Sequence, residues 1–232
     1  MGDVTPVVLR RRLQELRYRM AAACARSGRD PASVRLVAVS KTMPASIVRA
    51  ALEAGQDLFG ENRVQEARAK IADTGPGAHW HLIGHLQTNK ARQAVGLFEL
   101  IHSVDDAALA IELDRRAGLA EIVQPVLLQA NLAREETKHG ADEPGLESLA
   151  ETVARLRHLD LRGLMIIPPP AVDAESSRPW FQRLRAASDR LARHLGRPLP
   201  EISMGMSHDF EVAIEEGATL IRVGRAVFGD RS

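Results

Sequence analysis

Strand and helix patterns alternate along almost the whole chain, and this alternation limits the possible folds more than any other feature. Short apolar runs recur eight times, and nearly all are separated by stretches in which apolar residues have helical spacing. The expected strands cover residues 35–40, 57–62, 79–84, 97–103, 123–131, 159–167, 201–204 and 219–223. The expected helices between them cover residues 44–54, 63–72, 88–95, 105–117, 143–157, 177–194 and 208–216. Such alternation predicts a parallel sheet with its helices packed outside it.

Eight strand–helix units fit the 232 residues of the chain if the sheet closes into a (β/α)8 barrel of the TIM type. A further helix is expected over 6–27, where Leu9, Leu13 and Leu16 recur at helical spacing. We therefore predict an α/β fold, with a single barrel domain over residues 1–232 and an extra N-terminal helix. An open doubly wound sheet is the alternative.

Charge and cysteine content narrow the classes of partner and compartment. The net charge is +1 and the arginines are spread along the chain, which gives no indication of nucleic acid or of a membrane surface as a partner. The single cysteine, Cys24, excludes an internal disulfide and fits a reducing compartment. Apolar runs of membrane-spanning length and a secretory signal are not seen in the sequence. We expect a cytoplasmic protein.

Lys41 directly follows the first expected strand, at the end of a parallel strand where sites are usually built. Lysine is rare here, since only four of the 31 basic residues are lysines. Burial at the mouth of an apolar strand lowers the pKa of a lysine and favours the neutral amine that a Schiff base requires. The alternative is a strand-end lysine that extends into solvent. Lys70 and Lys90 lie in helical, charged surroundings, and we expect them at the surface.

Two segments near the C-terminus have the character of phosphate ligands. Ser203-Met-Gly-Met-Ser207 lies between a strand and a helix, and Ile221-Arg-Val-Gly-Arg225 ends the eighth strand. In a (β/α)8 barrel, phosphate is often held by the loops after strands seven and eight. The alternative is that Ser207 only caps the following helix. Asp209, in the first turn of that helix, would repel a phosphate bound nearby. Together with Lys41, the two segments indicate a phosphate-bearing aldehyde, and pyridoxal phosphate (PLP) is the obvious candidate.

Motifs along most of the chain carry a family resemblance. They are Val37-Ala-Val-Ser-Lys41, Phe59-Gly-Glu-Asn62 with Gln65-Glu66, Trp80-His-Leu-Ile-Gly84 with Leu86-Gln-Thr-Asn-Lys90, Arg162-Gly-Leu-Met165, Ser203-Met-Gly-Met-Ser207, and Arg222-Val-Gly224 with Phe228-Gly229. With these motifs the chain resembles the pyridoxal phosphate homeostasis protein family. The resemblance implies an alanine-racemase-type barrel, fold type III among PLP-binding proteins.

The resemblance also implies how the cofactor is held. Lys41 would form the aldimine, Arg222 would face the pyridine nitrogen, and Asn62 and Met165 would line the ring. The resemblance implies that Ser207, Gly224 and the backbone of Arg225, with Ser203 as a further candidate, hold the phosphate. A small hydroxyl residue is common in the family at the position of Arg225, so the role of this side chain stays open.

The same residues favour a cofactor carrier over an amino-acid-converting enzyme. A racemase needs acid and base groups on both faces of the substrate, and alanine racemases supply one as a tyrosine from a separate C-terminal β domain. The chain as given ends after the eighth strand, and its one tyrosine, Tyr18, lies in the first helix. Arginine only donates, so Arg222 would leave the pyridine nitrogen unprotonated.

We therefore expect a monomeric protein that holds PLP, maintains the intracellular PLP pool without a conventional catalytic activity, and passes the cofactor to apo-enzymes. The alternatives are a weak PLP-dependent amino-acid racemase or lyase, and a scaffold that binds no cofactor.

Two further groups of residues leave alternatives open. Lys138, in the loop after the fifth strand, is either a second amine for cofactor transfer or a mobile loop lysine. His79, His81 and His85 could bind zinc, but cysteine and acidic ligands are missing nearby in sequence, so we expect no metal. We place His85 near the cofactor instead, and we expect Phe59 and Trp80 in the core.

Overall fold

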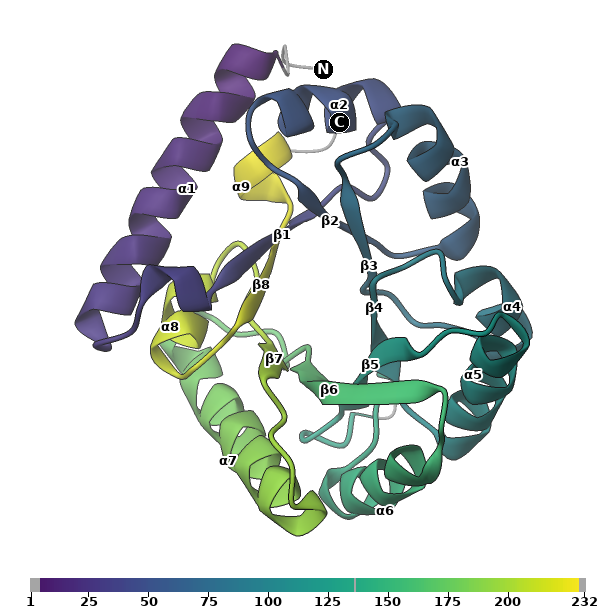
Figure 1. Ribbon diagram of the computed structural model, residues 1–232. Coiled ribbons are helices and arrows are strands. Elements are labelled where there is room, and N and C mark those ends of the chain that lie inside the picture. Colours follow the sequence, from purple (N-terminus) through teal and green to yellow (C-terminus); the bar gives the residue numbers. More distant parts are fainter. Residues whose placement is uncertain (1–4, 136, 230–232) are drawn as a thin grey trace.

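Eight parallel strands close into a barrel in a computed structural model that describes residues 5–135 and 137–229. Each strand pairs with the next along the chain, and β8 pairs with β1, as Figure 1 shows in a view along the barrel. The strands are β1 (Arg35–Val39), β2 (Leu58–Glu61), β3 (His79–Leu82), β4 (Leu100–Val104), β5 (Gln124–Ala130), β6 (Leu159–Ile166), β7 (Glu201–Ser203) and β8 (Leu220–Val223). The closed barrel confirms the predicted fold class and excludes the open doubly wound sheet. That residues 1–232 form one domain stays a prediction.

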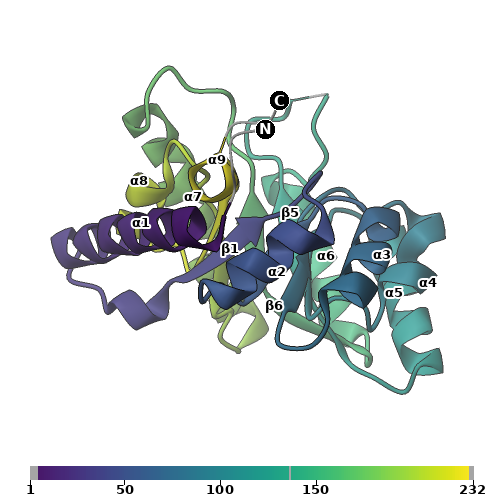
Figure 2. The ribbon, with the colours of Figure 1, turned by 90° about the horizontal axis from the view of Figure 1, so that it is seen from above.

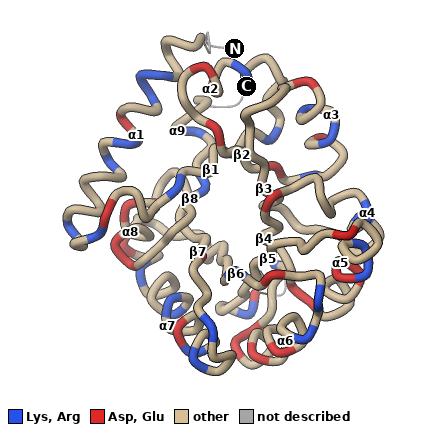
Figure 3. The backbone as a smooth tube through the Cα atoms, in the orientation of Figure 1, with Lys and Arg blue, Asp and Glu red and all other residues tan. Residues whose placement is uncertain are grey.

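Helices surround the ring of strands (Figure 1). They are α1 (Pro6–Arg26), α2 (Ala45–Glu53), α3 (Val64–Thr74), α4 (Ala91–Ala94), α5 (Ala107–Leu119), α6 (Glu143–Arg155), α7 (Arg178–Leu195), α8 (Phe210–Glu215) and α9 (Arg225–Phe228). Short 3-10 turns are η1 (Pro31–Ser33), η2 (Thr88–Lys90) and η3 (Glu175–Ser177). Basic and acidic residues are interspersed around the outer helices (Figure 3). None of the described helices is both long enough and apolar enough to cross a bilayer.

The predicted N-terminal helix is confirmed as α1. The Thr5 hydroxyl caps it by accepting a hydrogen bond from the Val8 N–H, at 3.4 Å. Leu9, Leu13 and Leu16 are buried because their spacing places them on one face of the helix. That face packs against α2, α8 and α9. The helix α1 therefore covers the side of the barrel where the first strand and the last strand meet.

Two sets of side chains fill the molecule. The larger apolar cluster lies between the strands and the helices and includes Phe59 and Trp80, whose ring centroids are 5.3 Å apart, as predicted for core residues. The smaller cluster comprises Val37, Val39, Leu58, Ile83, Leu100, Leu127, Met165 and Leu220. Its members come from strands around the barrel, or directly follow one, so they fill the interior that the strands enclose.

Element boundaries differ from the expectations mainly where helices are short. The helix expected over 88–95 consists of the turn η2 and the four-residue α4. The helix expected from 208 begins only at Phe210, and α9 was not expected at all. The helix expected over 105–117 is shifted by two residues, since α5 runs from Ala107 to Leu119. Helix ends fray, so a sequence pattern locates them only to within one or two residues.

Candidate functional site

A cavity of about 580 Å³ opens at the carboxyl ends of the strands, and most of the predicted cofactor-binding residues line it. The lining residues are Val39, Lys41, Asn62, Ile83, Ile167, Met206, Ser207, His208, Arg222, Gly224 and Arg225. In Figure 2 α9 and the loop that leads to α7 project from the same side of the barrel. The fold therefore brings together segments that are as much as about 180 residues apart in sequence.

Lys41 sits in a tight turn at the end of β1. The N–H of Met43 donates to the carbonyl of Ser40, at 2.9 Å, across this turn. Thr42 has a φ of 66°, in the left-handed region that β-branched residues avoid. The chain therefore reverses direction directly after Lys41, and the lysine side chain joins the cavity lining instead of continuing the strand.

A buried ion pair supports this turn from behind, and it corrects one prediction. Lys70, expected at the surface, is only 8% exposed, and its ammonium donates to the Ser40 carbonyl at 2.7 Å and to the Glu61 carboxylate at 2.5 Å. The Ser40 hydroxyl donates to the same carboxylate oxygen, at 2.6 Å. A helical charge pattern does not show which strand end the helix meets. The available signal was Glu61, an acidic residue within a buried strand that requires a cation.

Arg222 enters the cavity from β8 and is held by two hydrogen bonds. Its guanidinium donates to the Ser203 hydroxyl at 2.5 Å and to the Ile166 carbonyl at 2.7 Å. Burial lowers the pKa of Arg222 to about 10, and the nearby Asp209 carboxylate opposes this shift. Because this pKa is still well above 7, the guanidinium remains a cation and a donor at neutral pH.

A chain of buried polar groups continues from Arg222 into the barrel. The Ser203 hydroxyl contacts His102 Nδ1 at 2.9 Å, and His102 Nε2 contacts His81 Nδ1 at 3.0 Å. Burial lowers the pKa of His81 to about 3 and lowers that of His102 well below its usual value. Both rings are therefore neutral at pH 7, and each can donate one hydrogen bond and accept another. His102 was not predicted, although a histidine in an apolar strand signals a buried polar contact.

Two predicted residues lie outside the cavity lining. Met165 is fully buried in the interior cluster, and Ser203 is fully buried with its hydroxyl engaged by Arg222 and His102. Direct contact of these two residues with a ligand stays a prediction. In this structure Ser203 instead orients the guanidinium of Arg222.

The loops after β7 and β8 contribute Ser207, Gly224 and Arg225 to the wall of the cavity, beside the end of β1 because β8 pairs with β1. Gly205 has a φ of 89°, and a Cβ there would lie 2.5 Å from the Cβ of Ala213, so glycine is needed for the loop to pack this closely. Ser207 does not cap α8, because the residue at that position is Asp209. The Asp209 carboxylate accepts the N–H of Met206, at 2.7 Å. It therefore fixes the loop that carries Ser207.

The three histidines considered together in the sequence lie in three different environments. His79 is exposed and contacts Glu99 at 2.5 Å, whereas His81 belongs to the buried chain below Arg222. His85 stacks on His139 with ring centroids 3.5 Å apart, and both rings lie beside Asp105.

His85 lines a second cavity, of about 270 Å³, that shares Asn62, Ile83 and Ile167 with the first. Lys138 lines this second cavity too. Its ammonium pairs with Glu135 of its own loop at 2.7 Å and donates to the carbonyl of Pro168, in the loop after β6, at 3.0 Å, so two contacts hold it in place.

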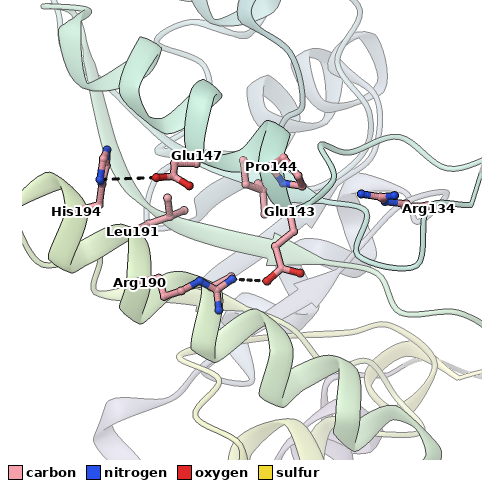
Figure 4. A pocket seen from close by; sticks show the side chains of 9 residues that line it. Arg134, Glu143, Pro144, Glu147, Arg190, Leu191 and His194 are labelled. Atoms are coloured by element: carbon pink, nitrogen blue, oxygen red, sulfur yellow. Dashed lines mark hydrogen bonds and ion pairs between the residues drawn. The ribbon is translucent and has the colours of Figure 1, made fainter.

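A further hollow of about 530 Å³ lies on the outside of the barrel, between α6 and α7. Figure 4 shows Arg190 directed at Glu143 and His194 directed at Glu147 across this hollow. Leu191 contributes an apolar surface between them. Since these charges satisfy one another and come from outer helix faces, the hollow is a helix–helix contact rather than part of the cavity at the strand ends.

Comparison with known proteins identifies the fold of the chain. The family described as alanine racemase, N-terminal domain, matches residues 12–232. Solved structures include an alanine racemase from Bartonella henselae, with a TM-score of 0.72 and 16% identity over 98% of this chain and 59% of that one. At this identity the likeness establishes the fold alone, which is the alanine-racemase-type barrel.

Much closer relatives identify the family. A pyridoxal phosphate homeostasis protein from Aquifex aeolicus is 44% identical over 95% of this chain and 97% of that protein. One from Escherichia coli is 39% identical over 94% and 95%. PipY from Synechococcus elongatus, solved with PLP bound, has a TM-score of 0.85 and 42% identity over 95% of this chain and all of that one. The chain belongs to the pyridoxal phosphate homeostasis protein family, whose curated members here carry the name of a homeostasis protein rather than of an enzyme.

Proposed function

We propose that this protein binds PLP in the cavity at the strand ends, as an aldimine with Lys41, and that it maintains the PLP pool without a conventional catalytic activity. The observation that carries the proposal is that Lys41 shares one cavity with Arg222, Ser207 and Gly224. An amine, a buried cation and two loops after β7 and β8 are the groups that an aldehyde with a pyridine ring and a phosphate requires.

Each end of the cavity suits one part of this ligand. In the proposed complex the phosphate lies against Ser207, Gly224 and the backbone N–H of Arg225, because the first turn of a helix leaves its N–H groups without helical acceptors. The Arg225 side chain remains available for a charge interaction with the phosphate. Arg222 would donate to the pyridine nitrogen, and Asn62 would lie beside the ring.

Lys41 is the residue whose loss should matter most. We expect Lys41→Ala to abolish the aldimine absorption and to weaken PLP retention during dialysis. Lys90→Ala is the matched control, because Lys90 is a half-buried lysine in the turn η2 that does not line the cavity. Equal retention of PLP by both variants would refute Lys41 as the anchor.

The carrier interpretation rests on how Arg222 is held. A charged guanidinium cannot accept a hydrogen bond, so it would not stabilise a protonated pyridine nitrogen. PLP here would therefore be a weaker electron sink than in enzymes that protonate this atom. The single tyrosine, Tyr18, is 77% exposed on α1 and cannot serve as an acid or base in the cavity. We therefore expect little exchange of amino-acid Cα protons in deuterated water. Rapid exchange that Lys41→Ala abolishes would instead establish the alternative, a weak racemase or lyase.

Transfer to apo-enzymes, a cytoplasmic location and a monomeric state complete the proposal. The single buried cysteine, Cys24, fits a reducing compartment.

Lys138 is the second amine near the cavity, so Lys138→Ala should change the rates of PLP uptake or release if this lysine takes part in transfer. Unchanged rates would show that it does not.

A further inference from the structure

Three side chains that follow successive strands meet on the barrel rim beside the cofactor cavity. His85 follows β3, Asp105 follows β4, and His139 lies in the loop between β5 and α6. One ligand atom from each lies within 4.8 Å of the others. We propose that His85, Asp105 and His139 form a binding site for a divalent transition-metal ion, for which Zn²⁺ is the best match.

The spacing of the donor atoms is close to that of a zinc site. Asp105 Oδ2 lies 3.3 Å from His85 Nδ1 and 3.7 Å from His139 Nδ1. Ligand atoms about 2.0–2.1 Å from a tetrahedral zinc ion lie about 3.3 Å from one another. The two imidazole rings are stacked, with an interplanar angle of 6° and centroids 3.5 Å apart. Because the lone pair of a ring nitrogen lies in the ring plane, both rings must rotate before the two lone pairs converge on one ion. Both side chains are partly exposed, at 34% for His85 and 56% for His139, which leaves room for this rotation.

Asp105 provides independent evidence for a missing cation. Its side chain is only 8% exposed, and Oδ1 is buried without a hydrogen bond from the described residues. Its Oδ2 lies 3.3 Å from His85 Nδ1, and the 3.7 Å contact with His139 is too long for a hydrogen bond. A buried carboxylate with so little compensation is costly, and a metal ion between it and the two imidazoles would remove that cost.

The donor set selects the class of metal. Two imidazoles and one carboxylate are typical of zinc sites that keep a fourth position for water, whereas Ca²⁺ and Mg²⁺ prefer oxygen ligands alone. Both histidines line the cavity of about 270 Å³, so the fourth position opens into it. This set escaped the sequence analysis because its ligands come from three separate loops, and only His85 belongs to the histidine group first considered.

The test uses the full chain freed of PLP, so that its outcome does not depend on the proposed cofactor function. Equilibrium dialysis against Zn²⁺, with metal quantified by mass spectrometry, should give one ion per chain. Co²⁺ in its place should show the intense visible absorption of tetrahedral coordination. His139→Asn and Asp105→Asn should each weaken Zn²⁺ binding by about tenfold or more.

His79→Asn is the matched control, because His79 is an exposed histidine that pairs with Glu99 outside the cluster. His139 is 56% exposed, so its replacement should leave folding intact, and circular dichroism would verify this. Loss of binding in the cluster variants but not in His79→Asn supports the site. Absence of Zn²⁺ binding by the unmodified chain, or unchanged affinity in both cluster variants, would overturn the proposal.

Discussion

Breaking the ion pair behind Lys41 should cost the protein much of its stability. Lys70→Met keeps the length and apolar stem of the side chain but removes the ammonium that Glu61 and the Ser40 carbonyl share. The two paired side chains are 8% and 0% exposed, and Glu61 Oε2 is already buried without a hydrogen bond from the described residues. Removing one member of such a pair costs about 3–5 kcal/mol, because the remaining charge stays buried and uncompensated.

Urea denaturation followed by circular dichroism would measure this change in the free energy of unfolding. In a chain of 232 residues the same loss should lower the melting temperature by roughly 6–20 °C. Lys90→Met is the matched control and should change stability by less than about 0.5 kcal/mol. The double variant Lys70→Met/Glu61→Gln should recover part of the loss, because the buried charge is then gone. A loss below about 1 kcal/mol in Lys70→Met would refute the buried pair.

Three further perturbations test other parts of the structure. The pKa of His81 is about 3 in the folded protein and about 6.5 when unfolded, so the unfolded state binds more protons below pH 6.5. This histidine should therefore lower the free energy of unfolding by about 2 kcal/mol between pH 7 and 5. In urea titrations at the two pH values, His81→Gln should lack this contribution to the pH dependence of stability. Gly205→Ala should destabilise the protein by about 1–3 kcal/mol through its clash with Ala213. The control Gly28→Ala has open space around it and should show only the smaller cost of its positive φ. Equal losses of melting temperature in the two variants would argue against the close packing at Gly205. Thr42→Gly should keep or raise the melting temperature, because it relieves a left-handed threonine at about 1–2 kcal/mol; a fall of several degrees would show that the threonine side chain makes an essential contact.

The alternation of strand and helix patterns was sufficient to predict the barrel, because a parallel sheet of eight units has few other ways to bury both faces. It also placed Lys41, Ser207 and Arg222 at or near the carboxyl ends of strands. Because all strands of a parallel barrel point the same way, these ends meet on one rim. Six of the eight predicted cofactor-binding residues line one cavity.

Contacts between side chains from different loops were harder to foresee. The helical pattern around Lys70 does not reveal that this residue faces the end of β1, and Met165 and Ser203 point into the interior below the cavity. One residue of strand register decides whether a side chain faces the barrel interior or the helices. Similarly, the meeting of His85 with Asp105 and His139 depends on loop conformations that sequence spacing does not encode.

The central claim is that Lys41 anchors PLP, and covalent trapping tests it most directly. The purified protein would be incubated with PLP, its absorption spectrum recorded, and the sample treated with borohydride before peptide mass mapping. Because the chain has four lysines, the modified residue can be assigned unambiguously. We predict an aldimine band that borohydride removes, with the reduced adduct on Lys41. An adduct on Lys138 instead, or no band after addition of PLP, would contradict the proposed site.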